Sequence, residues 1–182
     1  LRSRVSDLVR EADDEQLERR APAAPEWRVR DLVAHLSGIT ADINAGNLDG
    51  VATDAWTARP VDARRDWSIE QLLEEWDTEA AKVEAVMSSL PEVAVGQMTT
   101  DAATHEQDIR GGLERPGARD CDALAIGYDW GVPNVRVPIV VGAVIDDLAL
   151  GDGRIRVGPD EAYRACEAAS PAAVAEGSAT AG

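Results

Sequence analysis

Several residue types are scarce in this chain of 182 residues. It has no phenylalanine, a single lysine (Lys82), two histidines and two cysteines. Cys121 and Cys166 are far apart and form no Cys-x-x-Cys pair, so we interpret them as reduced thiols of a cytosolic protein. With aromatic residues at only 4% of the chain, the core must be filled by Leu, Val, Ala and Ile.

Positive charge and long apolar runs are also scarce. The formal net charge is −16, which disfavours binding to nucleic acid or to anionic membranes because both would repel the chain. The longest apolar run, residues 137–145, falls well short of the ~18 residues of a membrane span. The first residues are polar and charged, unlike a signal peptide. We therefore expect a cytoplasmic protein without nucleic-acid or membrane partners. The sequence leaves open whether it forms a homodimer.

Apolar residues at helical spacing predict four helices in the first two thirds of the chain. They cover residues 2–20, 27–44, a third stretch that opens at Ser68 and stops at Pro91, and residues 97–112. Ser68 is the expected N-cap of the third helix, with Gln71 in the capping-box position. Residues 45–66 lack periodicity and predict a long crossover loop.

This order predicts a mainly α protein, a four-helix bundle with a long connection between its second and third helices. Residues 1–116 would form the bundle. Residues 117–167 would form a small α+β unit, with a fifth helix over residues 122–131 and a hairpin over residues 135–157. Residues 168–182, rich in Ala, Ser, Gly and Pro, resemble a disordered tail.

Both histidines of the chain fall where a metal site could use them. His35 lies beside the apolar stripe of the second helix, so it should point toward a core or a cavity. Asp101 and His105 are four residues apart and share one face of the fourth helix. Together they would supply three protein ligands and leave a position open, as in a catalytic zinc site. On spacing alone, an ordinary Asp–His helix pair with a core-edge histidine is the simpler interpretation.

Two segments resemble one family. Residues 25–36 (PEWRVRDLVAHL) and residues 101–110 (DAATHEQDIR) resemble the second-helix and fourth-helix motifs of the mycothiol-dependent maleylpyruvate isomerases, within the DinB-like four-helix superfamily. The resemblance covers roughly residues 1–120, and residues 153–160 show a weaker similarity to the family's C-terminal unit. The chain differs in carrying Asp101, where the isomerase more often has Glu, and Arg28, where a Ser or Thr cap is common.

The resemblance implies a divalent metal, usually zinc, with nickel as the other candidate, held by His35, Asp101 and His105. It also implies mycothiol, a low-molecular-weight thiol, as cosubstrate, because a metal ionises a bound thiol and a thiolate is a strong nucleophile. The reaction would be an isomerisation or a transfer of the thiol to an electrophilic substrate. Arg154 and Arg156 could bind substrate carboxylates, although solvated strand residues are the simpler interpretation.

Two acidic residues near His105, Glu106 and Asp108, are not expected to be metal ligands. Asp108 should orient a ligand histidine through a hydrogen bond, and Glu106 should face outward, about 100° round the helix from His105. Neither should bind the metal. The alternative function is a non-catalytic helical bundle with a structural or sensory metal, and a fourth protein ligand would favour it.

Overall fold

The computed structural model describes residues 1–134, which are helical apart from turns, loops and one isolated bridge between Arg20 and Arg28. The predicted hairpin, the tail, Arg154, Arg156 and Cys166 lie outside the described residues. The helices are α1 (Arg2–Arg10), α2 (Asp14–Leu17), α3 (Val29–Ala45), α4 (Asp54–Ala63), α5 (Ile69–Val86), α6 (Glu92–Gly112) and α7 (Asp122–Asn134), with a 3₁₀ turn η1 (Met87–Ser89) between α5 and α6.

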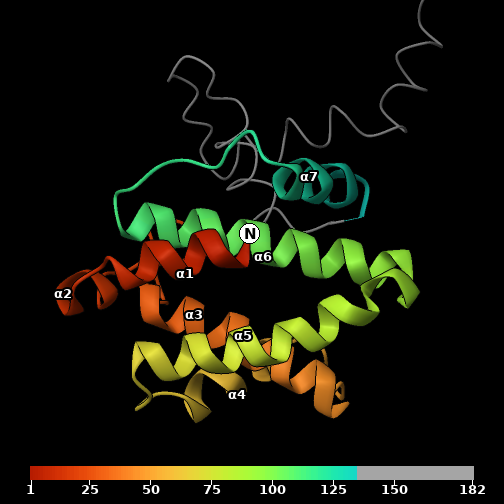
Figure 1. The fold of residues 1–182 in the computed structure, drawn as a ribbon, viewed down its shortest axis with the longest axis horizontal. Coiled ribbons are helices and arrows are strands. Elements are labelled where there is room, and N and C mark those ends of the chain that lie inside the picture. The colour runs from red at the N-terminus through yellow and green to blue at the C-terminus, as the bar shows by residue number, and fades with distance from the viewer. Residues whose placement is uncertain (135–182) are drawn as a thin grey trace, which may run out of the picture.

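Helices α1, α3, α5 and α6 form the predicted bundle. Helix α3 packs along α5 and also contacts α6, while α1 contacts α5. Figure 1 shows α1 and α6 in one layer and α3 and α5 in the other, with α4 below and α7 above. The predicted mainly α fold is confirmed for this part of the chain. The fifth helix predicted over residues 122–131 is present as α7.

Aliphatic side chains from both layers fill the core between them. Leu32, Leu36, Leu72, Leu73 and Ile109 are each at most 2% exposed, and burial of such a side chain contributes roughly 1.5–3 kcal/mol. The same cluster includes Val5, Val9, Leu17, Ala21, Val29, Val33, Ala34, Trp76, Ala80 and Leu113. Because these residues come from five helices, the core fixes α3 against α6 and so positions the faces that carry His35 and His105.

Helix caps explain where two bundle helices begin. The Ser68 hydroxyl accepts from the Gln71 amide at 3.2 Å, and the Gln71 side chain accepts from the Ser68 amide at 2.8 Å. The predicted capping box of α5 is therefore confirmed. At α3 the cap residue is Arg28, whose side chain cannot accept a hydrogen bond. Instead, the Asp31 carboxylate reaches back to the Arg28 amide at 2.9 Å.

Two expectations about the helices were wrong. The predicted loop over residues 45–66 contains α4, which begins at a Thr53 cap and continues through Pro60. This helix packs on α3 where Gly38 lacks a side chain, since a Cβ there would lie 2.3 Å from the Pro60 Cβ. The predicted helix over residues 2–20 is divided into α1 and α2 because Asp13 caps a new helix and accepts from the Gln16 amide at 2.8 Å.

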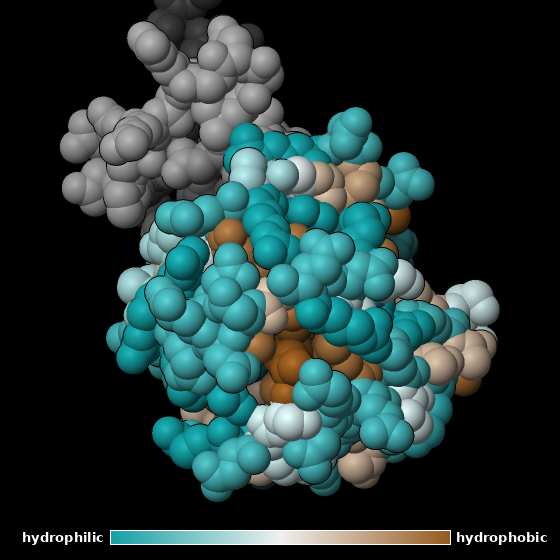
Figure 2. Space-filling view, turned by 60° about the vertical axis from the view of Figure 1, so that its left-hand side comes forward, coloured by the Kyte–Doolittle hydropathy of each residue, from teal (hydrophilic) through white to brown (hydrophobic). Residues whose placement is uncertain are grey.

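The face shown in Figure 2 is largely hydrophilic, with hydrophobic residues gathered in a patch near its centre. This distribution fits a chain with 34 acidic and 18 basic residues. Among the helices of residues 1–134, none is both long enough and apolar enough to cross a membrane.

Candidate metal centre

Helices α3 and α6 bring the three predicted ligands together across the bundle. The Asp101 carboxylate lies between the two histidines, with Oδ2 at 3.5 Å from His35 Nε2 and Oδ1 at 3.5 Å from His105 Nε2. One ligand atom from each residue lies within 4.8 Å of the others. The four-residue spacing of Asp101 and His105 places both on the face of α6 that meets α3. The geometry is that of two nitrogen donors and one oxygen donor facing a common point.

Burial without hydrogen bonds makes this cluster unusual. His35 is only 3% exposed, and neither of its ring nitrogens has a hydrogen-bond partner within the described residues. Asp101 Oδ2 is buried and equally without a partner. Buried polar atoms are almost always satisfied, and an exception calls for a ligand, an ion or a water. A divalent cation would satisfy His35 Nε2 and the carboxylate at once, so the residues present fit a metal.

Asp108 holds the far side of the His105 ring. Its Oδ2 accepts a hydrogen bond from His105 Nδ1 at 2.8 Å, and Asp108 is only 5% exposed. An ionised carboxylate can only accept, so in the neutral ring the proton resides on Nδ1 and the Nε2 lone pair is directed toward Asp101. Such carboxylate–histidine pairs commonly fix the ring of a metal-binding histidine. The hydrogen bond predicted for Asp108 is thus present.

Neighbouring charged groups lower the pKa of Asp101 and raise the pKa of His105. Desolvation by itself would raise the pKa of Asp101, but the adjacent imidazoles of His35 and His105 outweigh it and hold that pKa below its ordinary value. Desolvation opposes protonation of His105, yet the Asp101 and Asp108 carboxylates raise the pKa of this imidazole above its ordinary value. A cation, whether a proton or a metal, is therefore favoured between these side chains.

Trp27 covers the histidines, although sequence reasoning did not include it in the site. Its ring centroid lies 5.0 Å from that of His35 and 5.8 Å from that of His105, nearly parallel to the latter. It precedes α3 in a turn, where no periodicity indicates the direction of a side chain. The one signal was its position within the family-like segment, eight residues before His35. The half-buried indole separates part of the cluster from water.

Glu106 does not face outward as predicted. It is 1% exposed and accepts from Arg4 Nε at 3.0 Å, from a second Arg4 nitrogen at 2.7 Å, and from the Arg110 guanidinium at 3.0 and 3.1 Å. The expectation failed because it assumed water beyond the face of α6 next to His105. Helix α1 lies there and supplies Arg4. With two arginines bound to its carboxylate, Glu106 is occupied by a structural ion-pair network.

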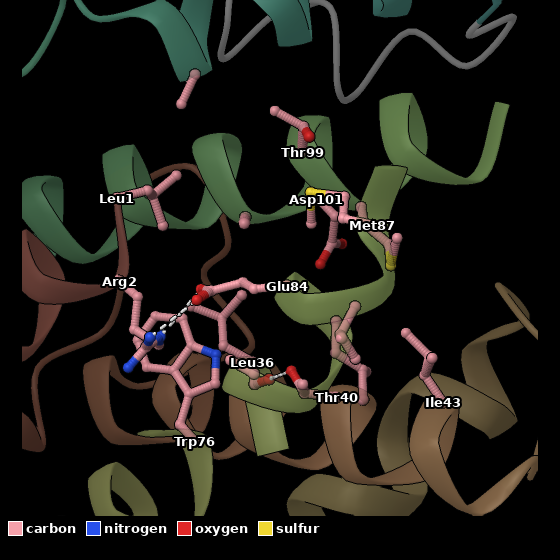
Figure 3. A pocket seen from close by; sticks show the side chains of 16 residues that line it. Leu1, Arg2, Leu36, Thr40, Ile43, Trp76, Glu84, Met87, Thr99 and Asp101 are labelled. Carbon is pink, nitrogen blue, oxygen red and sulfur yellow. Dashed lines mark hydrogen bonds and ion pairs between the residues drawn. The ribbon is translucent and has the colours of Figure 1, made fainter. Parts of the chain in front are cut away.

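A pocket of about 200 Å³ opens beside the cluster, and Asp101 belongs to its wall. Figure 3 shows the Asp101 carboxylate and Met87 among the side chains that line it. The wall is contributed mainly by α3, α5 and α6, and includes Leu36, Ile39, Ile43, Trp76, Ala80, Val83, Met98 and Ala102. Through Asp101, the candidate metal centre thus borders a mostly apolar space between the two layers of the bundle.

A family model named mycothiol maleylpyruvate isomerase N-terminal domain matches residues 1–110. The chain belongs to this family. The match spans α1 to α5 and nearly all of α6, and it includes the three residues of the cluster, His35, Asp101 and His105, together with Asp108. The resemblance inferred from the two motifs is therefore confirmed, and the bundle is a DinB-like helical domain. No curated protein and no solved structure matches the chain significantly.

Proposed function

We propose that this chain is a metal-dependent enzyme that uses mycothiol as its nucleophile, in an isomerase or a thiol S-transferase reaction. One divalent metal, zinc or nickel, would be bound by His35, Asp101 and His105. The observation that carries the proposal is that both ring nitrogens of His35 are buried without a hydrogen-bond partner, next to a carboxylate oxygen of Asp101 that also lacks one.

The residues have distinct parts in this proposal. His35 and His105 would supply neutral nitrogen donors and Asp101 an anionic oxygen donor, with Asp108 holding the His105 ring in place. Bound there, a divalent metal would supply a Lewis acid that lowers the pKa of an incoming thiol enough to ionise it at neutral pH. Trp27 would restrict water around the histidines and so preserve the strength of these electrostatic interactions.

The proposed chemistry is addition of the mycothiol sulfur to an electrophilic carbon. In an isomerisation, the thiol adds to an activated double bond, the former double bond rotates, and the same thiol leaves. In a transfer, the carbon–sulfur bond persists and a thioether is released. The family description, which names a mycothiol maleylpyruvate isomerase, supports this class of reaction.

The alternative is a bundle that keeps the metal for structure or sensing. A fourth protein ligand would be expected in that case. Among residues 1–134, His35, Asp101 and His105 form the only group of three or more His, Cys, Asp or Glu side chains that could hold a metal ion. Glu106 is held by two arginines, and Asp108 binds the nitrogen of His105 that faces away from Asp101. These contacts support an open coordination position and hence the enzyme.

The test is thiol-dependent turnover by metal-loaded protein. The protein is incubated with maleylpyruvate, and separately with an epoxide or an enone, in the presence of mycothiol, of another thiol, or of none. We expect turnover only with thiol and metal together. Equal turnover with and without thiol would instead indicate that the metal activates water, as in a hydrolase.

A matched pair of variants separates the cluster from general effects of charge removal. Asp101→Ala should abolish the metal-dependent turnover. Asp7→Ala, at an exposed aspartate of α1 whose side chain is 76% exposed, should leave it unchanged. Unaltered turnover in Asp101→Ala would refute the assignment of the metal to this cluster.

A further inference from the structure

We propose that the pocket beside Asp101 binds an uncharged, apolar chain of the electrophilic substrate. This inference rests on the proposed function and narrows its substrate class. It predicts a substrate whose reactive carbon carries an aliphatic or similar apolar group, in contrast to a small dicarboxylate such as maleylpyruvate.

The wall of the pocket is suited to hydrocarbon. Ile39, Ile43, Met87 and Met98 line it and are only partly buried, so the empty pocket leaves apolar surface uncovered. Covering such surface is favourable in proportion to its area. The unbranched, polarisable methionine side chains adapt to ligands of different shape. A hydrophobic ligand would complete the packing that the four helices leave unfinished.

Arg2, Glu84 and the Thr40 hydroxyl of the wall are already engaged by neighbouring groups. Arg2 donates to Glu84 at 3.1 and 3.2 Å and also to Asp77, so two carboxylates neutralise one guanidinium. Figure 3 shows Arg2 turned toward Glu84. The Thr40 hydroxyl donates to the Leu36 carbonyl at 2.6 Å. Within residues 1–134, Arg2 is the only cationic side chain of the wall, and its two carboxylate partners already occupy it.

Acidic groups at the pocket disfavour anionic ligands further. Asp101 and Glu84 both line the pocket, and the Glu84 side chain is 51% exposed. In the metal-free protein, an anionic chain placed there would approach these carboxylates without compensation, whereas a neutral chain would carry no charge to be repelled. Placement beside Asp101 would also bring the reactive end of a bound chain next to His35 and His105.

The volume sets the length of the chain. An apolar cavity of about 150 Å³ accommodates benzene, so a pocket of about 200 Å³ should hold roughly six to eight carbon atoms. Each buried methylene should tighten binding about fourfold until the pocket is full. Affinity should then level off.

Binding is tested first, without any chemistry. Neutral 1-alkanols of increasing length are titrated into metal-free and metal-loaded protein by calorimetry, and alkanoates of the same lengths serve as charged counterparts. We expect affinity to rise about fourfold per methylene for the alkanols, with a plateau near six to eight carbons and much weaker binding of the alkanoates to the metal-free protein.

Two adjacent alanines of α5 provide matched variants. Ala80 is buried and lines the pocket, whereas Ala81 is exposed. Ala80→Leu adds three carbons inside the pocket and should shift the plateau to chains shorter by about that number. Ala81→Leu should not shift it. Circular dichroism and zinc content establish that both variants stay folded and metal-competent.

Turnover is then measured with 1,2-epoxyalkanes of the same lengths and mycothiol. In this reaction a carbon–sulfur bond forms as the carbon–oxygen bond of the ring breaks, and the oxygen takes up the proton that the thiol lost. We expect kcat/KM to follow the alkanol series and Ala80→Leu to shift both in parallel.

The outcomes of these experiments distinguish the apolar-chain proposal from the proposed thiol-dependent function. Alkanol affinity that is independent of chain length, or unaffected by Ala80→Leu, would overturn the apolar-chain proposal even if thiol-dependent turnover exists. Chain-dependent alkanol binding without thiol-dependent turnover would sustain the pocket and refute the proposed function. Faster turnover of maleylpyruvate than of every epoxyalkane would refute the proposed substrate class and leave the thiol chemistry intact.

Discussion

Replacing Asp108 with Asn tests how the cluster holds a metal. Asp108 accepts from His105 Nδ1 at 2.8 Å and is 5% exposed, so this hydrogen bond is shielded from water. Asn retains an oxygen in the same place but loses the negative charge, which roughly halves the strength of a charge-assisted bond. Loss of such orienting groups typically weakens metal binding 10- to 100-fold. Because Asn can still accept, we expect the lower end, about tenfold, or about 1.4 kcal/mol.

The assay is competition for zinc between the protein and a chromophoric chelator. The control is Asp7→Asn on α1, which removes an exposed charge and should leave zinc affinity unchanged. Circular dichroism must show that both variants keep their helices. Complete loss of zinc from Asp108→Asn would mean that Asp108 is itself a ligand. Affinity equal to the wild type would mean that Asp108 does not orient His105 for the metal.

Three further predictions follow from the same contacts. His105→Ala should lose the metal but remain helical by circular dichroism, since burial of the core side chains stabilises the bundle; global unfolding on chelation of the wild type would favour a structural metal. Glu106→Gln should lower the free energy of unfolding by roughly 3 kcal/mol in denaturant titrations, because it leaves two arginines without their shared carboxylate; a change below 0.5 kcal/mol, the scale of a neutral surface substitution, would contradict this. Zinc affinity should fall as the pH falls through the raised pKa of His105, because a proton on this ring competes with zinc, and the fall should approach about tenfold per pH unit. The lowered pKa of Asp101 keeps that carboxylate ionised over the same range. A zinc affinity that rises on acidification would refute this prediction.

Local sequence signals sufficed for most of the bundle. The apolar stripes identified α3, α5 and α6, and the Ser68–Gln71 pair located the start of α5. Helix α4 was not predicted because Pro60 and the surrounding polar residues have low helix propensity. What stabilises it is tertiary, namely the close approach of Pro60 to α3 over Gly38. The break after α1 was visible in principle, since Asp13 and Gln16 form the same capping pattern as at α5.

The cluster shows a similar division between local and tertiary information. Spacing of four residues places Asp101 and His105 on one face, and the stripe beside His35 directs it inward, so their juxtaposition could be predicted. Trp27 could not, because a residue in a turn has no periodic face. Glu106 was misplaced because the position of α1, which supplies its arginine partner, depends on the packing of helices remote in sequence.

Zinc stoichiometry by elemental analysis tests the central claim most directly. Protein is loaded with zinc, desalted and analysed beside Asp101→Ala and the control Asp7→Ala, with circular dichroism to verify that all three are folded. We predict one zinc per chain in the wild type and the control, and none in folded Asp101→Ala, because that variant removes the carboxylate between His35 and His105. Zinc retained in full by Asp101→Ala, or absent from the wild type, would contradict the metal centre.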